Sequence, residues 1–129
     1  MPNWQPNRSD VVWDWGAAND AANELERAAG LLDELTARRR RAADTAREEW
    51  RGRYRDEFDR DLDEMLRRAG ELADQMRRKA REIRGAADRA RDQQNFRVSE
   101  RNRWESERRE EERREREERE RREREQRNR

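Results

Sequence analysis

This chain contains neither cysteine nor histidine. It therefore has no disulfide, no thiol nucleophile and no imidazole base, and it lacks the usual protein ligands of zinc. A glycine-rich phosphate loop is also missing. Carboxylates are abundant, but catalytic carboxylates need an enclosed site that separates their pKa values, and the sequence offers no elements to enclose one. We therefore expect a protein that is not an enzyme and binds no cofactor or metal.

Long apolar runs are missing as well. No segment approaches the ~20 apolar residues that cross a bilayer, and we find no charged-then-apolar pattern of a cleavable signal peptide. Hydrophobic residues make up 29% of the 129 residues and charged residues 52%, a composition typical of long solvated helices or of disorder. The 34 basic and 33 acidic residues leave a net charge of +1, so bulk charge does not favour nucleic acid as a partner.

Proline is confined to the start of the chain, at Pro2 and Pro6. Because proline lacks a backbone donor and fixes φ, residues 1–8 are predicted to form an extended arm. Ser9 or Asp10 is then expected to cap the first helix by accepting hydrogen bonds from its free amides.

Two long helical stripes follow, over residues 11–50 and 58–90, in which apolar or small residues recur at alternating steps of four and three. The first stripe ends at Trp50, and Gly52 follows it before the second stripe begins. Glycine adopts the positive φ of a helix end at little cost, and tryptophan can cover the open end of a two-helix seam. The spacing therefore predicts an all-α fold in which residues 9–96 form an antiparallel helical hairpin.

The residues predicted to line the seam of this hairpin, or its contact in a dimer, are Trp15, Leu25, Leu32, Leu35, Phe58, Leu62, Met65, Leu72, Met76 and Ile83.

Folding the chain back at Gly52 is expected to place Leu32 near Leu72, Leu35 near Ala69, and Trp15 near Ala87 and Ala90. The stripes are rich in alanine, so a single hairpin buries little apolar area against the entropy of the chain. We therefore expect two hairpins to dimerise into a four-helix bundle.

Residues 97–129 consist almost entirely of arginine and glutamate. Such residues at spacings of three and four stabilise a solvated helix, and the alternative is a disordered mixed-charge tail. Val98 and Trp104 are the large apolar residues of this tail, so no core is expected there. The run from Arg38 to Arg41 is interpreted as a solvated face rather than a phosphate contact, since acidic residues follow it closely.

Two long helices joined at Trp50-Arg51-Gly52, with no leader, resemble the WXG (ESAT-type) family of small proteins exported by type VII secretion. The Trp-rich segment before an alanine-rich helix resembles its actinobacterial members in particular. In that family a Tyr-x-x-x-Asp/Glu motif at the end of the second helix acts as an export signal. The nearest equivalent here is Phe96 with Glu100, in which phenylalanine replaces the tyrosine. The Arg/Glu tail is a further departure from the family pattern.

The resemblance implies a type VII secretion substrate, or an escort for a secreted effector, exported without a cleavable signal peptide to the cell surface or medium. It implies a homodimer, or a heterodimer with a related hairpin, and contact with an effector and the secretion ATPase. The alternative is a cytoplasmic coiled-coil scaffold in which the tail is a charged spacer. A third reading, a helical nucleic-acid-associated protein, would use Arg38 to Arg41 and the tail.

Overall fold

The computed structural model describes residues 1–129 and contains two helices, α1 (Trp15–Arg47) and α2 (Arg53–Arg127). There is no strand, so the predicted all-α class is confirmed. Contacts divide the chain into two units, which we call the hairpin unit, Asp14–Ala87, and the arm unit, Met1–Trp13 with Asp88–Arg129. The boundaries predicted from the sequence fall after residues 8 and 96, whereas those of the structure fall after residues 13 and 87. They differ because the sequence pattern does not indicate which part of the chain the arm contacts.

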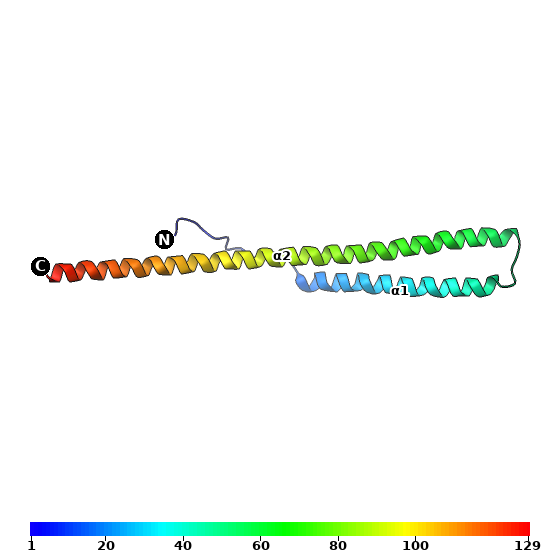
Figure 1. The fold of residues 1–129 in the computed structure, drawn as a ribbon, viewed down its shortest axis with the longest axis horizontal. Coiled ribbons are helices and arrows are strands. Elements are labelled where there is room, and N and C mark those ends of the chain that lie inside the picture. The colour runs from blue at the N-terminus through cyan, green and yellow to red at the C-terminus, as the bar shows by residue number, and fades with distance from the viewer. The chain divides into compact units, whose positions relative to one another are not determined.

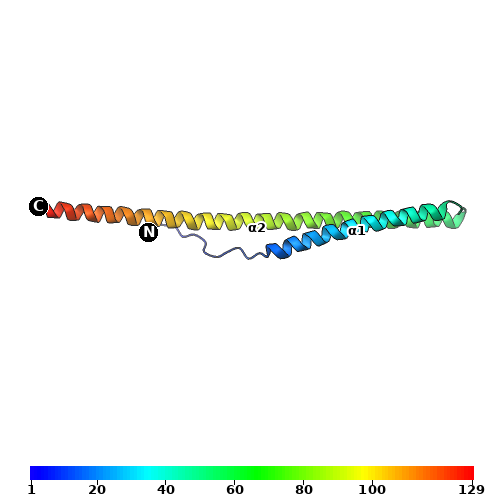
Figure 2. The ribbon, with the colours of Figure 1, turned by 90° about the horizontal axis from the view of Figure 1, so that it is seen from below.

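In the hairpin unit, α1 runs back along the first part of α2, as the two perpendicular views in Figure 1 and Figure 2 show. The helix α1 begins at Trp15, and the side chain of Asp14 accepts a hydrogen bond from the Ala17 amide at 2.9 Å. The prediction that Ser9 or Asp10 caps this helix was therefore wrong. Backbone groups of this segment instead bond to side chains of α2 within the arm unit, which keeps the chain extended up to Trp13.

The reversal of the chain lies where the sequence predicts it. α1 ends at Arg47, α2 begins at Arg53, and Gly52 has a φ of +110°, the one positive φ in the chain. The Trp50 ring packs against Phe58, with 5.2 Å between ring centroids and 50° between planes. Trp50 is 36% exposed, so its ring lies over the end of the hairpin without being enclosed by it.

Small side chains occupy the centre of the contact between the two helices. Ala22 and Ala29 are fully buried on α1, and Ala73 and Ala80 are fully buried on α2. The members of each pair are seven residues apart, a spacing that returns them to one face of the helix. Because alanine has no atoms beyond Cβ, the central seam contributes little apolar area of its own.

The larger predicted seam residues flank this alanine centre. Leu62 is buried, in a cluster with Ala43 and Leu66, whereas Leu35, Met65 and Leu72 are 47%, 39% and 46% exposed. The remaining predicted seam residues are half-buried: Trp15, Leu25, Leu32, Phe58, Met76 and Ile83.

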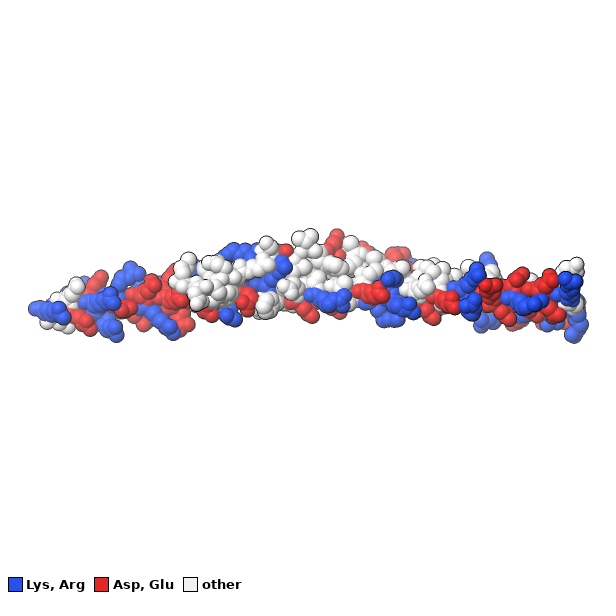
Figure 3. All heavy atoms as spheres, turned by 90° about the horizontal axis from the view of Figure 1, so that it is seen from above, with Lys and Arg blue, Asp and Glu red and all other residues white.

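In the arm unit, the Arg/Glu tail is helical as far as Arg127. Pairs four residues apart support it, among them Glu110 with Arg114 at 2.9 Å and Glu118 with Arg122 at 2.7 Å. Figure 3 shows acidic and basic side chains mixed over the visible face of this end of α2. The expectation that no core can form in the tail was wrong, because Trp104 is only 7% exposed.

Candidate interaction surfaces

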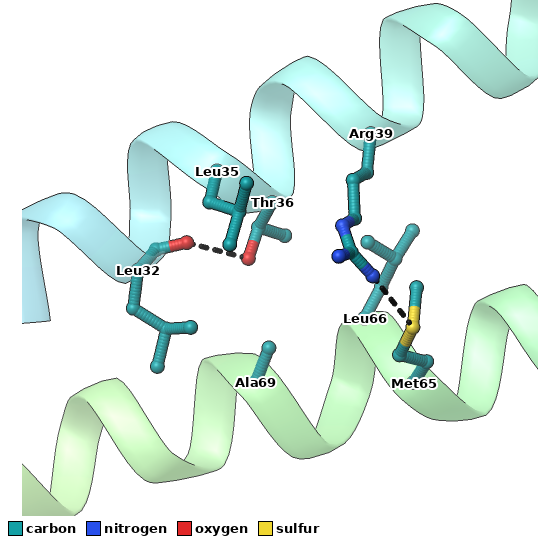
Figure 4. Close-up of a pocket in the computed structure, with 7 residues that line it drawn as sticks. All are labelled: Leu32, Leu35, Thr36, Arg39, Met65, Leu66 and Ala69. Carbon is teal, nitrogen blue, oxygen red and sulfur yellow. Dashed lines mark hydrogen bonds between the residues drawn. The ribbon is translucent and has the colours of Figure 1, made fainter.

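The first candidate surface is an apolar groove on the hairpin unit, with a volume of about 170 Å³. One wall comes from α1 and the other from α2, and Figure 4 shows Leu32 and Arg39 pointing from α1 towards α2, and Ala69 pointing back. Leu35 and Ala69 line the same groove, so their predicted proximity is confirmed. The complete lining is Leu32, Leu35, Thr36, Arg39, Met65, Leu66 and Ala69.

The polar atoms of this groove are already engaged or lie at one end. The Thr36 hydroxyl donates to the Leu32 carbonyl oxygen at 2.7 Å, which uses its one donor hydrogen. Arg39 donates to the sulfur of Met65 at 3.4 Å and forms no ion pair. The groove therefore offers apolar contact along its length and one uncompensated cation at its edge.

Ion pairs between the helices fix the register of the hairpin. Arg77 pairs with Asp33, and Arg47 reaches across to Asp59 at 2.8 Å. The Asp59 carboxylate is the largest cause that raises the pKa of Arg47 above its ordinary value, with Asp44 adding to it. Arg77 and Asp33 are exposed, whereas Arg47 and Asp59 are half-buried; with solvent still reaching both pairs, they specify alignment more than they stabilise.

The far end of the hairpin is closed by Trp15. Its indole N–H donates to the Ala87 carbonyl oxygen at 3.0 Å, which confirms the predicted proximity of these two residues. The bond gives the half-buried ring a fixed orientation on α2.

The predicted export-signal residues lie in the arm unit. Phe96 is 59% exposed, and Glu100 forms an ion pair with Arg103 at 3.6 Å. Both are on α2 and four residues apart, so they share one face of the helix. The turn residues Trp50 and Gly52 belong to the other unit.

The second candidate surface was missed by the sequence reasoning. It is a row of α2 residues that holds the arm, which we call the arm site: Gln94, Arg97, Arg101, Trp104, Arg108 and Glu111. These residues continue the steps of three and four that end at Ala90 in the predicted stripe. That spacing was the available signal, but most of the residues are polar and therefore do not look like a packing face.

Side chains of the arm site bind the backbone of the arm. Arg101 donates to the carbonyl oxygens of Asn7 at 2.9 Å and Ser9 at 2.8 Å, and Arg97 donates to Ser9 at 3.0 Å. Gln94 accepts from the amide of Val11 at 2.7 Å. An extended strand is required for these bonds, since a helix would use the same backbone groups internally.

Arm side chains add a second set of contacts. The Trp4 ring lies 4.6 Å from the guanidinium carbon of Arg103, and its N–H donates to Glu107 at 2.7 Å. Pro2 and Pro6 are buried. The Gln94 amide, followed by the Arg101 guanidinium, lowers the pKa of Asp10.

Neither helix holds a stretch long and apolar enough to span a lipid bilayer. Comparisons with protein-family models, curated proteins and solved structures gave no match to this chain.

Proposed function

We propose that the hairpin unit is a docking module that joins a second helical hairpin through its apolar groove and flank, forming a four-helix bundle. The observation that carries this proposal is that no large side chain of the chain is fully buried. The two helices, with their alanine centre, leave Leu35, Met65 and Leu72 between 39% and 47% exposed, and a second pair of helices is the usual way to cover such side chains.

The exposed apolar side chains are arranged as such a contact requires. On α2, Met65, Ala69 and Leu72 follow one another at steps of four and three, and on α1 Leu32 and Leu35 face the same groove. Rows with this spacing interdigitate with a facing helix. The partner is either a second copy or a related hairpin.

The docking proposal is tested by exchanging Leu32, which lines the groove, and Leu72, which is 46% exposed beside it, together for aspartate. Each charge would be buried without a partner in the bundle, so we expect the dissociation constant to rise by at least about 100-fold. The matched control is Leu31→Asp, since Leu31 is also on α1, is 59% exposed and does not line the groove.

The measurement is mass by light scattering or sedimentation at micromolar concentration. A wild-type dimer that becomes a monomer only in the double variant supports the proposal. A monomeric wild type that unfolds cooperatively on its own would contradict the need for a partner.

We further propose that this module serves type VII secretion, as a substrate or as the escort of a secreted effector, with no enzymatic activity of its own. Support comes from the resemblance at Trp50 and Gly52 and from the helical hairpin around them. The exposed ring of Phe96, one turn from Glu100, is available to a receptor groove.

The export proposal is tested in an actinobacterial host with an active type VII system. We expect the chain in the culture filtrate, and its retention in cells when Phe96→Ala and Glu100→Ala are combined. Equal export of wild type and variant would place the signal on a partner, and retention of both would refute export.

The helical tail favours a second candidate, a cytoplasmic scaffold in which it acts as a charged spacer. Ion pairs spaced along residues 100–122 would keep such a spacer helical without a partner. Retention of the wild type in cells, together with an intact dimer, would favour this candidate.

A further inference from the structure

Besides the contacts of Gln94 and Arg101 with the Asp10 side chain, the arm site makes four bonds to backbone groups of residues 7–11, which any extended segment presents. Buried prolines at two positions fit the same description, because proline favours extended backbone and packs on aromatic surfaces.

The arm leaves donors of the site without acceptors. The indole N–H of Trp104 has no hydrogen-bond partner although the side chain is more than nine-tenths buried. The Nε atoms of Arg97 and Arg108 are likewise buried and unpaired. Each such donor has lost its water without gaining a bond in return, so a ligand that carries acceptors would bind better than the arm does.

At this point the arm presents a cation to a ring that already has another cation beside it. Arg8 lies over the Trp104 ring at 4.9 Å from its centroid, and Arg108 lies near the same ring at 5.8 Å. The nearby carboxylate of Glu105 is already bound by Arg108 at 2.6 Å. In contrast, the acidic arm residue Asp10 is paired with Arg101 at 2.9 Å.

The connection between arm and helix allows the arm to leave. Val12 is 98% exposed, and the division between the two units falls after Trp13. The contacts that hold the hairpin unit together therefore do not include the arm, and detachment of the arm would leave them in place.

We propose that the arm site is a binding site for an extended, proline-containing, acidic segment of another protein, and that the arm occupies it until that segment displaces it. The arginines bind the backbone of the incoming strand, and its carboxylates pair with the donors that the arm leaves free.

The probes are two labelled synthetic peptides of residues 1–13, one with the native sequence and one carrying Arg8→Glu. They are titrated by fluorescence anisotropy into three full-length proteins: wild type, Trp4→Ala, and Trp4→Ala with Arg101→Gln. Trp4→Ala weakens the hold of the resident arm and leaves every arm-site residue intact. Far-ultraviolet circular dichroism of each protein checks that the helices are preserved.

The Arg8→Glu peptide should bind the Trp4→Ala protein about tenfold more tightly than the native peptide does, since charge-assisted bonds are the stronger ones. Wild type should bind both peptides more weakly, because a tethered arm competes at an effective concentration in the millimolar range. Arg101→Gln should abolish binding.

Tighter binding of the native peptide would overturn the proposal in favour of the arm of a second copy. Equal binding to wild type and Trp4→Ala would show that the peptides bind elsewhere. Absence of binding up to about 1 mM, the effective concentration of a tethered arm, would show that the arm site takes no separate ligand.

Discussion

Two glycines of the hairpin unit allow the effect of backbone geometry to be separated from that of packing. Gly52 lies in the turn with φ +110°, and Gly30 lies inside α1. A methyl group added to either would meet no atom within 4 Å. Gly52→Ala and Gly30→Ala therefore add the same atoms to equally open space, and only the backbone conformation differs.

The two substitutions should change stability in opposite directions. An L side chain at a φ of this kind costs on the order of 1–2 kcal/mol of folding free energy. In a helix, alanine is more favourable than glycine by about 0.5–1 kcal/mol, because an unfolded chain with alanine has less conformational freedom to lose when it folds. The variants should consequently differ from each other by about 2 kcal/mol.

Urea unfolding followed by circular dichroism at 222 nm measures this difference, with protein concentration held fixed because association would shift the midpoint. Gly70→Ala, also helical and also without a close neighbour, is a second control that should behave like Gly30→Ala. If Gly52→Ala proved as stabilising as the two helical variants, the chain would not turn at Gly52 as described, and a continuous helix through the site would be favoured.

Three further predictions concern the seam, the turn and the arm. Ala29→Leu should destabilise the hairpin by about 1–3 kcal/mol in the same urea assay, because the added atoms overfill a fully buried position; a gain in stability would show that the helices can separate there. Trp50→Ala should cost about 1–2 kcal/mol, below the range for enclosed tryptophans, since the ring is partly exposed; a loss of 4 kcal/mol or more, the upper part of that range, would mean that the ring is enclosed. The pKa of Asp10 is lowered in the folded chain. Its ionised carboxylate therefore stabilises the bound arm at pH values above the ordinary pKa of 3.8, and this stabilisation is lost as the pH falls through the lower pKa of the folded chain. Energy transfer between dyes at introduced cysteines Gln5→Cys and Ser106→Cys should show arm release in that acidic window, and Asp10→Asn should weaken the arm at neutral pH and reduce this pH response.

The hairpin could be predicted from the sequence because its signals are local. Steps of three and four define one face of each helix, and Gly52 supplies the single backbone conformation that other residues resist. The proximity of Leu35 and Ala69 then follows from counting equal distances from Gly52, and that of Trp15 and Ala87 from the same count to within two residues.

The position of the leucines within the seam could not be predicted in the same way. Heptad spacing defines a stripe several residues wide, and it does not say which row of the stripe faces the partner helix. Here the row with Ala22 and Ala29 lies at the centre, which leaves Leu35 at the edge. The close packing of the two whole helices decides which row lies at the centre, and this cannot be read from any short segment of the sequence.

The start of α1 and the arm site escaped prediction for a shared reason. Asp10 and Asp14 are both good caps, and what selects Asp14 is the bonding of the preceding backbone to Gln94 and Arg101, more than eighty residues later in the chain. Polar side chains that bind a backbone follow no hydrophobic pattern, so the arm site carries only its spacing as a signal.

The alanine seam has a consequence for how the hairpin responds to temperature. The heat-capacity increase of unfolding grows with the apolar surface exposed, and a seam centred on Ala22, Ala29, Ala73 and Ala80 exposes little. The free energy of unfolding of the isolated hairpin should therefore change little with temperature. It should fall only slightly on cooling, and thermal unfolding should be broad. A partner that covers Leu35, Met65 and Leu72 would add the missing apolar surface, so its binding should carry a negative heat-capacity change measurable by titration calorimetry at several temperatures.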